Sequence, residues 1–526
     1  MHSAPLSRSS DLTKVAQLST SQLTALVHSQ AQTITALTHQ LEWFKRQVFG
    51  HKSERFAPAL DPTQLHLGEA LPVPATLPES RQSVPAHTRR VPRTDLASAE
   101  AVPFFDESRV PVETITVIAA ETKTLAPDAF EVIGEKVSYR LAQRPGSYVV
   151  LKYVRPLIKR LDTHTIHCAP APAGVLEGSR ADVSFIAGLL VDKFAYHLPF
   201  YRQHQRLGDS GITVTRPWLT QLGQPGIGLL EPIYAAQFAS IQSSRVKAMD
   251  ETPIKAGRAG HGKLKTGYFW PVYGQEDEVC FPFFTSRAHD NVRALLGLQH
   301  QPNAVLISDG YAAYQRYAEK TGLTHAQCWA HARRTFFEAQ DSEPTGVAEA
   351  LEHIQAIYYI EAELRERKLT GEAKQSHRLT HSKPKVEAFF EWVEQQLARQ
   401  GFTPSNPFIK ALNYVRERRL GLEVFLSDPD VPIDTNHLER ALRVIPMGRK
   451  SWLFCWTELG AKQVGIIQSL IVTCRLHGID PYTYLVDVLQ RVSQHPASRV
   501  AELTPRLWKQ HFADNPLRSD LYDLHA

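Results

Sequence analysis

The sequence contains two short apolar runs that each end in an aspartate, Arg245-Val-Lys-Ala-Met-Asp250 and Ala304-Val-Leu-Ile-Ser-Asp309. Runs of this length and composition are typical of buried strands. Between them the pattern predicts two further strands, Gly267–Tyr273 and Val279–Phe284, and a helix over about 289–298. Three antiparallel strands, a helix and a fourth strand follow the order of a ribonuclease-H-like sheet. We therefore expect both aspartates at neighbouring strand positions, close enough to share a metal ion.

A third carboxylate follows a long helical stretch. Asp434-Thr-Asn-His-Leu-Glu-Arg-Ala-Leu-Arg443 begins with helix-capping residues and places Glu439 and Arg443 on one helix face. Together with Asp250 and Asp309, Glu439 would supply oxygen ligands that suit a pair of Mg²⁺ or Mn²⁺ ions. One ion would activate a water or 3′-hydroxyl, and the other would stabilise the leaving oxygen of a phosphodiester. A lone aspartate at a strand end is more often a cap or an ion-pair partner, which is the alternative.

Several ordered motifs resemble those of the insertion-sequence-66 family of bacterial transposases. They are Asp250-Glu-Thr-Pro, Gly267-Tyr-Phe-Trp-Pro-Val-Tyr, Ser308-Asp-Gly-Tyr-Ala-Ala-Tyr314, Cys328-Trp-Ala-His-Ala-Arg-Arg334, Asn436-His-Leu-Glu-Arg-Ala-Leu-Arg443, Met447-Gly-Arg-Lys-Ser-Trp-Leu-Phe454 and Gln468–Leu485. The likeness runs from about Leu41 to Val492. It implies a DDE transposase with Asp250, Asp309 and Glu439 as the catalytic, metal-binding triad. Such an enzyme would bind the terminal inverted repeats of its element, cut the 3′ ends and join them to target DNA.

Cations around the triad and on the strands before it are the expected DNA contacts, because a phosphodiester must be held while it carries negative charge. The candidates are Arg155, Lys159, Arg160, Arg216, Arg333, Arg334, Arg440, Arg443, Arg449 and Lys450. The stretch Ser147–Val154 is β-branched and aromatic and, with Val154–Arg160 after it, predicts strands. Residues 140–160 hold six positive charges and no acid. That density favours contact with the DNA backbone, and a solvated charged face is the alternative.

The segment after these strands has the outline of a helix-turn-helix. Two helices are predicted at Asp182–Lys193 and Pro199–Arg206, and a glycine-containing break follows over 207–212. Thr215 is placed to cap a third helix, Trp218–Leu222. Any helical hairpin gives a similar pattern, so the DNA-binding interpretation is not the only one.

The first hundred residues divide into a helix and a linker. Leu23, Val27, Gln30, Ile34, Leu37, Leu41, Phe44 and Val48 alternate at spacings of four and three. This heptad seam predicts a coiled coil that makes a homodimer or larger assembly, and an amphipathic helix packed on its own domain is the alternative. A proline-rich stretch follows over 57–111 and reads as a linker.

Zinc is not expected in this chain. Members of the resembled family commonly carry a small cysteine zinc module before the helix-turn-helix, but residues 112–167 contain no cysteine. The remaining metal-like spacing is His325, Cys328 and His331, which lacks a visible fourth ligand. We interpret these three side chains as packing near the active site, with a zinc site as the alternative.

Composition is that of a globular protein with a small basic excess. The 526 residues are 43% hydrophobic and 21% charged, with a net charge of +5. No apolar run is long enough to span a membrane and no signal peptide is evident, so we expect a cytoplasmic, nucleoid-associated protein with no membrane partner. Five cysteines without a CxxC pair argue against a disulfide framework.

The expected fold is an α/β catalytic core with a helical insertion, preceded by DNA-binding regions. The predicted divisions are 1–56 (coiled coil), 57–111 (linker), 112–176 (small basic β-rich domain), 177–235 (helix-turn-helix-like), 236–340 with 430–460 (ribonuclease-H-like core), 341–429 (helical insertion) and 461–526 (C-terminal helices). Family companion proteins could take part in transposition. Two other functions fit the pattern: a nuclease without strand transfer, and an inactive DNA-binding repressor derived from a transposase.

Overall fold

The computed structural model describes residues 104–119, 129–144, 146–260, 263–298, 302–399 and 403–523. They all belong to one compact unit that begins at Phe104. The predicted coiled coil and nearly all of the predicted linker lie outside the described residues. Within the described part, none of the helices has both the length and the apolar character that a membrane crossing requires.

A five-stranded mixed sheet carries the two predicted aspartates. Its order is β12 (Thr324–Gln327), β11 (Val305–Ser308), β5 (Val246–Met249), β8 (Val272–Tyr273) and β9 (Val279–Cys280). The first three strands are mutually parallel, whereas β8 runs antiparallel to both β5 and β9. All four residues of β5 and of β11 are buried. Strands covered on both faces read as continuous apolar runs, which is why these two could be predicted.

The two predicted middle strands are each divided in the structure. Gly267–Tyr273 is split between β7 (Lys263–Phe269) and β8, and Val279–Phe284 between β9 and β10 (Phe283–Phe284). Pro271 and Pro282 lie at the two divisions, and a proline has no backbone N–H to continue a ladder.

β7 and β10, the parts of these divided strands outside the five-stranded sheet, join a separate sheet. Its order is β10-β7-β6, and β6 (Thr252–Gly260) forms an antiparallel pair with β7. The sequence reading did not predict β6. Its glycines, Gly257 and Gly260, are typical of loops, and Gly257 has a positive φ of 72°.

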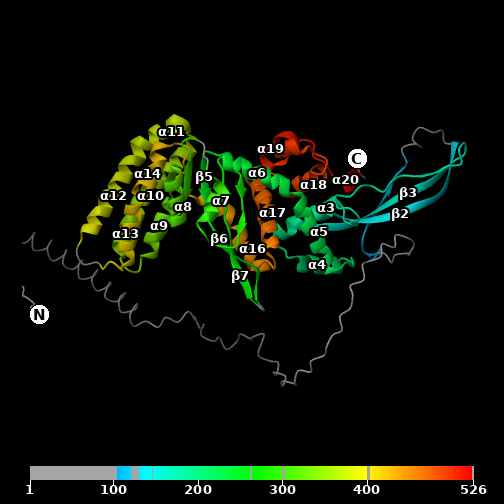
Figure 1. Cartoon of the computed structure of the whole chain (residues 1–526), viewed down its shortest axis with the longest axis horizontal. Helices are drawn as coiled ribbons and strands as arrows, with labels where there is room; N and C mark the ends of the chain where they lie inside the picture. The colour runs from blue at the N-terminus through cyan, green and yellow to red at the C-terminus, as the bar shows by residue number, and fades with distance from the viewer. Residues whose placement is uncertain are drawn as a thin grey trace, which may run out of the picture. The chain divides into compact units, whose positions relative to one another are not determined.

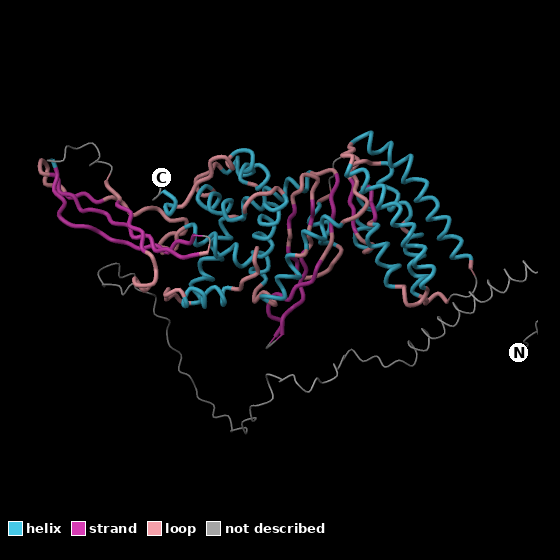
Figure 2. The backbone as a smooth tube through the Cα atoms, turned by 180° about the vertical axis from the view of Figure 1, so that it is seen from behind, coloured by secondary structure: helices cyan, strands magenta, loops and turns pink. Residues whose placement is uncertain are grey.

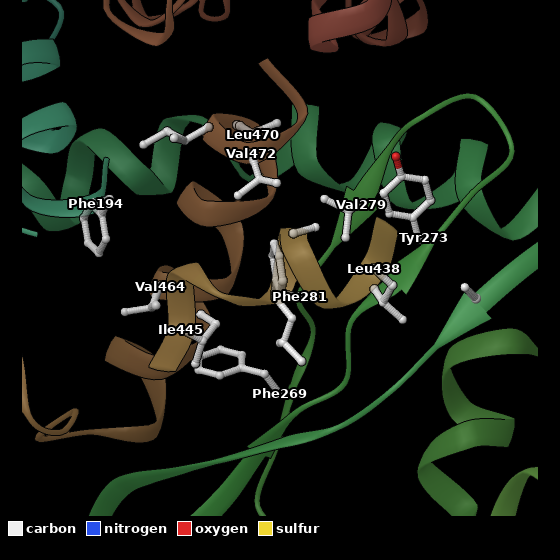
Figure 3. Packing of buried hydrophobic residues seen from close by; sticks show 14 of the residues in the cluster. Phe194, Phe269, Tyr273, Val279, Phe281, Leu438, Ile445, Val464, Leu470 and Val472 are labelled. Carbon is white, nitrogen blue, oxygen red and sulfur yellow. The ribbon is translucent and has the colours of Figure 1, made fainter. Parts of the chain in front are cut away.

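Helix α17 (Glu458–Leu476) and helix α15 (Asn436–Leu442) cover the core of the five-stranded sheet (Figure 3). Val279 and Phe281 belong to the same buried cluster as Leu470 and Val472 of α17, and Phe281 N donates to Ser469 Oγ at 2.9 Å. Leu438 of α15 is fully buried in the same cluster. The helix that carries the third predicted carboxylate is therefore fixed by the hydrophobic core.

Helices occupy the chain between the second and third carboxylates. They are α8 (Ala312–Thr321), α9 (Trp329–Glu338), α10 (Pro344–Glu366), α11 (Gly371–His377), α12 (Lys383–Ala398), α13 (Pro407–Glu417) and α14 (Arg419–Ser427), and α9–α14 group together in Figure 1. Inside this group a fully buried Arg378 donates to both carboxylate oxygens of Glu361 at 2.8 Å. A buried pair of this kind needs close geometry, because each charge has lost its hydration.

A second β-region precedes the helices of the N-terminal half. β1 (Val112–Thr116), β3 (Ser147–Arg160) and β2 (Phe130–Arg144) form a sheet in that order, and β4 (Ile166–Cys168) also pairs with β3. Figure 2 shows β2 and β3 as two long strands side by side. The stretches predicted as strands at Ser147–Val154 and Val154–Arg160 form one continuous strand, β3.

The three predicted helices that follow this β-region are present. They are α3 (Val183–Phe194), which has the predicted length, and α4 (Phe200–Asp209) and α5 (Arg216–Leu229), which are longer than predicted; a helix that was not predicted, α6 (Glu231–Ser243), follows them. The break expected from Leu207 begins only after Asp209, and the helix expected at 218–222 continues to Leu229 with Pro225 inside it. Thr215 has the extended backbone of a cap, but its side chain makes no capping hydrogen bond.

The remaining helices are α7 (Asp290–Leu296), α16 (Val444–Trp452), α18 (Pro481–Arg491), α19 (Pro505–His511) and α20 (Asp520–Asp523). Asp487 of α18 is fully buried and accepts hydrogen bonds from Arg491 at 2.7 and 2.8 Å and from Trp508 Nε1 at 3.0 Å. These contacts tie α18 to α19 and so close the C-terminal end of the core.

Candidate active site

Asp250 and Asp309 follow two neighbouring parallel strands. Val305 of β11 lies opposite Val246 of β5, so the two strands end at the same edge of the sheet. Each carboxylate is held by the backbone just after it: Asp250 Oδ1 accepts from Glu251 N at 2.7 Å, and Asp309 Oδ1 accepts from Tyr311 N at 2.9 Å. The sequence prediction that these aspartates occupy adjacent strand ends agrees with this register.

Glu439 comes to the same neighbourhood from α15. Its side chain is 32% exposed, and Oε1 lies 3.6 Å from Nε2 of His331, in the first turns of α9. Burial lowers the pKa of His331, while the negative charges of Asp309 and Glu439 oppose that shift. His331 therefore interacts with both the second and the third predicted carboxylates.

The pKa of Asp250 depends on the other two predicted carboxylates. Burial, together with the negative charges of Glu439, Glu251 and Asp309, raises the pKa of Asp250 to about 8. Oxygen ligands concentrated in this way fit a hard divalent cation, whose charge would offset their mutual repulsion. As the side chains are placed, no group of three or more His, Cys, Asp or Glu residues in the described ranges is close enough to hold an ion. The carboxylates share an electrostatic field without forming a coordination shell.

Sequence reasoning missed a carboxylate and an arginine beside the triad. Glu251 is only 3% exposed; its Oε1 accepts from Arg287 Nε at 2.8 Å, and its Oε2 accepts from Tyr314 OH at 2.6 Å. Arg287 also lies over the ring of Tyr311, 4.3 Å from its centroid. The signals were the acid adjacent to Asp250 and the two tyrosines of the Ser308–Tyr314 motif, but nothing local indicated their arginine partner.

The three residues with metal-like spacing bond to different partners. Cys328 Sγ, which is buried, accepts from Thr435 N at 3.3 Å and from Thr435 Oγ1 at 3.2 Å. His325 Nε2 lies 2.8 Å from Ser308 Oγ, and burial lowers the pKa of this imidazole to about 4. Because Thr435 precedes α15, Cys328 fixes the start of the helix that carries Glu439.

The acid at the start of that helix has its own anchor. Asp434 Oδ1 accepts from Asn436 N at 3.0 Å, and Asp434 Oδ2 accepts from Tyr358 OH of α10 at 2.8 Å. Trp329 N also donates to Ile433 O at 3.1 Å. The segment before Glu439 is thus bound to both α9 and the inserted helices.

The predicted DNA contacts fall into two groups. Arg333 and Arg334 on α9, Arg440 on α15, and Arg443, Lys450 and Arg216 are exposed. The half-buried cations are Arg155, Lys159, Arg160 and Arg449. Three of these four already have partners: Arg155 donates to Ala169 O at 3.2 Å, Arg160 pairs with Asp162 at 2.6 Å, and Arg449 donates to Pro253 O.

Position relative to the carboxylates separates these cations further. Arg334 acts electrostatically on His331, and Arg440 acts on His437 and Tyr273. Arg334 therefore lies near the carboxylate edge, and Arg440 directly follows Glu439 on α15. Arg155, Lys159 and Arg160 belong instead to β3 of the other sheet.

A mixed α/β core with many helices and carboxylates at one sheet edge is compatible with the catalytic domain of a transposase. The model of the family described as "Transposase IS66 family" matches residues 178–463, more than half of the chain. The model of the IS66 C-terminal element matches 469–506, and one described as transposase C of IS166 homeodomain matches 36–100. The chain therefore belongs to the IS66 family of transposases, as its motifs predicted.

Relatives of similar length occur in Sinorhizobium fredii. The protein named "Uncharacterized protein y4hP" is 28% identical over 506 residues, which cover 91% of this chain and 89% of the relative. "Uncharacterized protein y4jD" is 29% identical over 517 residues, which cover 93% of this chain and 97% of the relative. Both alignments span nearly the whole of each chain.

Proposed function

We propose that this transposase binds the terminal inverted repeats of an insertion sequence, cleaves their 3′ ends and transfers them to target DNA. The observation that carries the proposal is the common electrostatic neighbourhood of Asp250, Asp309 and Glu439, at the ends of two paired parallel strands and on α15. Carboxylates in this arrangement suit metal-assisted attack on a phosphodiester.

The sheet order supports a ribonuclease-H-like core. The first three strands along the chain, β5, β8 and β9, pair antiparallel, and β11 and β12 then add parallel strands on the other side of β5. This is the order predicted from the two apolar runs, with the aspartates after the first and fourth strands. The helices between β12 and α15 would be an insertion into that core.

Asp250, Asp309 and Glu439 would together hold two divalent ions, either Mg²⁺ or Mn²⁺. When bound, such ions activate the attacking water or 3′-hydroxyl and stabilise the leaving oxygen. The chain supplies the frame, because Cys328 and Leu438 fix α15, and exposed Arg334 and Arg440 bring positive charge to the same edge. The absence of zinc stays a prediction, and elemental analysis of the dialysed protein tests it.

The assembly is also a proposal. A homodimer or larger oligomer would form through the heptad seam of residues 23–48, and companion transposition proteins could join it on nucleoid DNA. Sedimentation of the full chain, compared with a variant carrying Ile34→Lys and Leu41→Lys, would distinguish a coiled coil from an internally packed helix.

A gel assay with labelled end DNA and added Mg²⁺ tests the reaction. Transposition predicts 3′-cut ends followed by joined products. Cut ends that never join would favour a nuclease without strand transfer. DNA that is bound but stays intact in both Mg²⁺ and Mn²⁺ would favour an inactive repressor and would contradict the proposed function.

A further inference from the structure

We infer that Arg287 is a DNA-contact residue that holds one backbone phosphate beside Asp309. Neither the sequence motifs nor the predicted set of cations includes it. The inference rests on the proposed function and deepens it, because it names one group that positions the DNA strand at the carboxylates.

The guanidinium of Arg287 is held in place before any DNA arrives. Nε and Nη2 donate to Glu251 Oε1, and the ring of Tyr311 lies under the guanidinium at 4.3 Å. Tyr311 OH donates to the backbone carbonyl of Arg287 at 2.9 Å. Glu251 is itself fixed by Tyr314 OH. A side chain that is already ordered loses little further freedom when it binds a ligand.

One edge of this guanidinium remains available. Among the residues that the structure describes, Nη1 of Arg287 makes no hydrogen bond, and the side chain is 47% exposed. The planar guanidinium therefore uses its Nε/Nη2 edge for Glu251 and leaves Nη1 for a further acceptor. Phosphate oxygens suit this free donor group, because charge-assisted N–H···O bonds to phosphate are short and strong.

Arg287 is linked to the second predicted carboxylate through Tyr311. Tyr311, on which Arg287 stacks, donates its backbone N–H to Asp309 Oδ1 at 2.9 Å, so one residue contacts both groups. A DNA strand at this edge would bring further negative charge to a place already rich in carboxylates. A fixed cation beside Asp309 would offset that repulsion and set the position of the strand.

Neutral phosphates in the substrate test the contact directly. The probes are duplexes from the ends of the element and a separate target duplex, each with single methylphosphonates placed in turn along the strands. Binding and cleavage are measured for the full-length wild-type chain, Arg287→Gln and Arg287→Lys. Arg293→Gln is the matched control, because Arg293 is exposed in the last turn of nearby α7.

We expect Arg287→Gln to lose the sensitivity to a methylphosphonate at one position of the DNA. Neutralising the contacted phosphate should weaken wild-type binding about tenfold, whereas Arg287→Gln should bind that duplex and the unmodified one equally. Arg293→Gln should retain the wild-type profile. The position found, in an end duplex or in the target duplex, identifies the strand that Arg287 holds.

Two other results would overturn the inference. If Arg287→Gln shows the wild-type methylphosphonate profile with a uniform loss of activity, or melts at lower temperature without any change of profile, Arg287 only supports Glu251. If the wild-type chain neither binds nor cuts any end duplex, the proposed function fails, and the phosphate contact fails with it.

Discussion

Two of the three described sheets, the five-stranded sheet and the sheet of β1–β4, use their strands in opposite ways. β5 and β11 are four residues long and buried throughout, and they end at carboxylates held by backbone N–H groups. β2 and β3 are 15 and 14 residues long, and β2 exposes apolar side chains such as Val132, which is 58% exposed. In the first sheet packing fixes the chemistry to a definite place, whereas the second offers length and accessible surface.

The largest expected effect comes from the end of β11. Asp309→Asn keeps the shape of the side chain and the bond from Tyr311, but it removes the charge that would hold a cation. We expect strand cleavage to fall at least ~10³-fold, of the order seen when a key electrostatic group is lost from an active site. Binding of end DNA, measured by gel shift, should persist. A variant that keeps half of its cleavage rate would exclude Asp309 from the triad.

The next largest expected effect is a difference in stability between a substitution in β11 and one in β2. Ile307 in β11 is 1% exposed, so Ile307→Ala should lower the free energy of unfolding by about 2–5 kcal/mol. Ile133 in β2 is 45% exposed, and Ile133→Ala should change it by less than about 0.5 kcal/mol. Urea unfolding of the two variants measures both. Equal losses would mean that β2 is covered in solution by something outside the described residues.

A substitution at Cys328 tests how α15 is held beside the five-stranded sheet. Cys328→Ala leaves Thr435 N and Oγ1 without their acceptor in a buried setting, which should cost about 1–3 kcal/mol. Because Glu439 lies four residues after Thr435, cleavage should fall while end binding holds. If Cys328→Ser restores both the stability and the cleavage rate, a hydrogen-bond acceptor at this position is sufficient. Loss of one stoichiometric zinc in Cys328→Ala would instead show that this cysteine is a metal ligand.

The features that could be predicted are those that depend on residues close together in the sequence. Continuous apolar runs that end in Asp250 and Asp309 predicted the strand ends, and the alternation of β-branched and aromatic residues predicted β3. Pro271 and Pro282 divide two strands that the apolar pattern predicts as whole ones, because a proline lacks the backbone N–H that continues a ladder. The signal for the division is therefore present in the sequence.

Long-range pairs could not be predicted in the same way. Glu251 and Arg287 are 36 residues apart in the chain, and Cys328 and Thr435 are 107 apart. Each pair forms because strands and helices bring distant segments together, and neither partner has a local pattern that marks the other. Motifs could name the three carboxylates proposed as the triad, whereas the residues that hold their surroundings in place are seen only in the folded chain.

The smallest expected effect lies on β3 and decides whether its cations touch DNA. Arg160 is paired with Asp162, whereas Lys159 has no ion-pair partner among the described residues. Lys159→Gln should therefore weaken end binding a few-fold and reduce the slope of log affinity against log salt by about one. Arg160→Gln should change that slope less, since its charge is already partly neutralised. If both variants keep the wild-type salt slope, the basic strand is a solvated face, and DNA recognition falls to the exposed cations near the carboxylates.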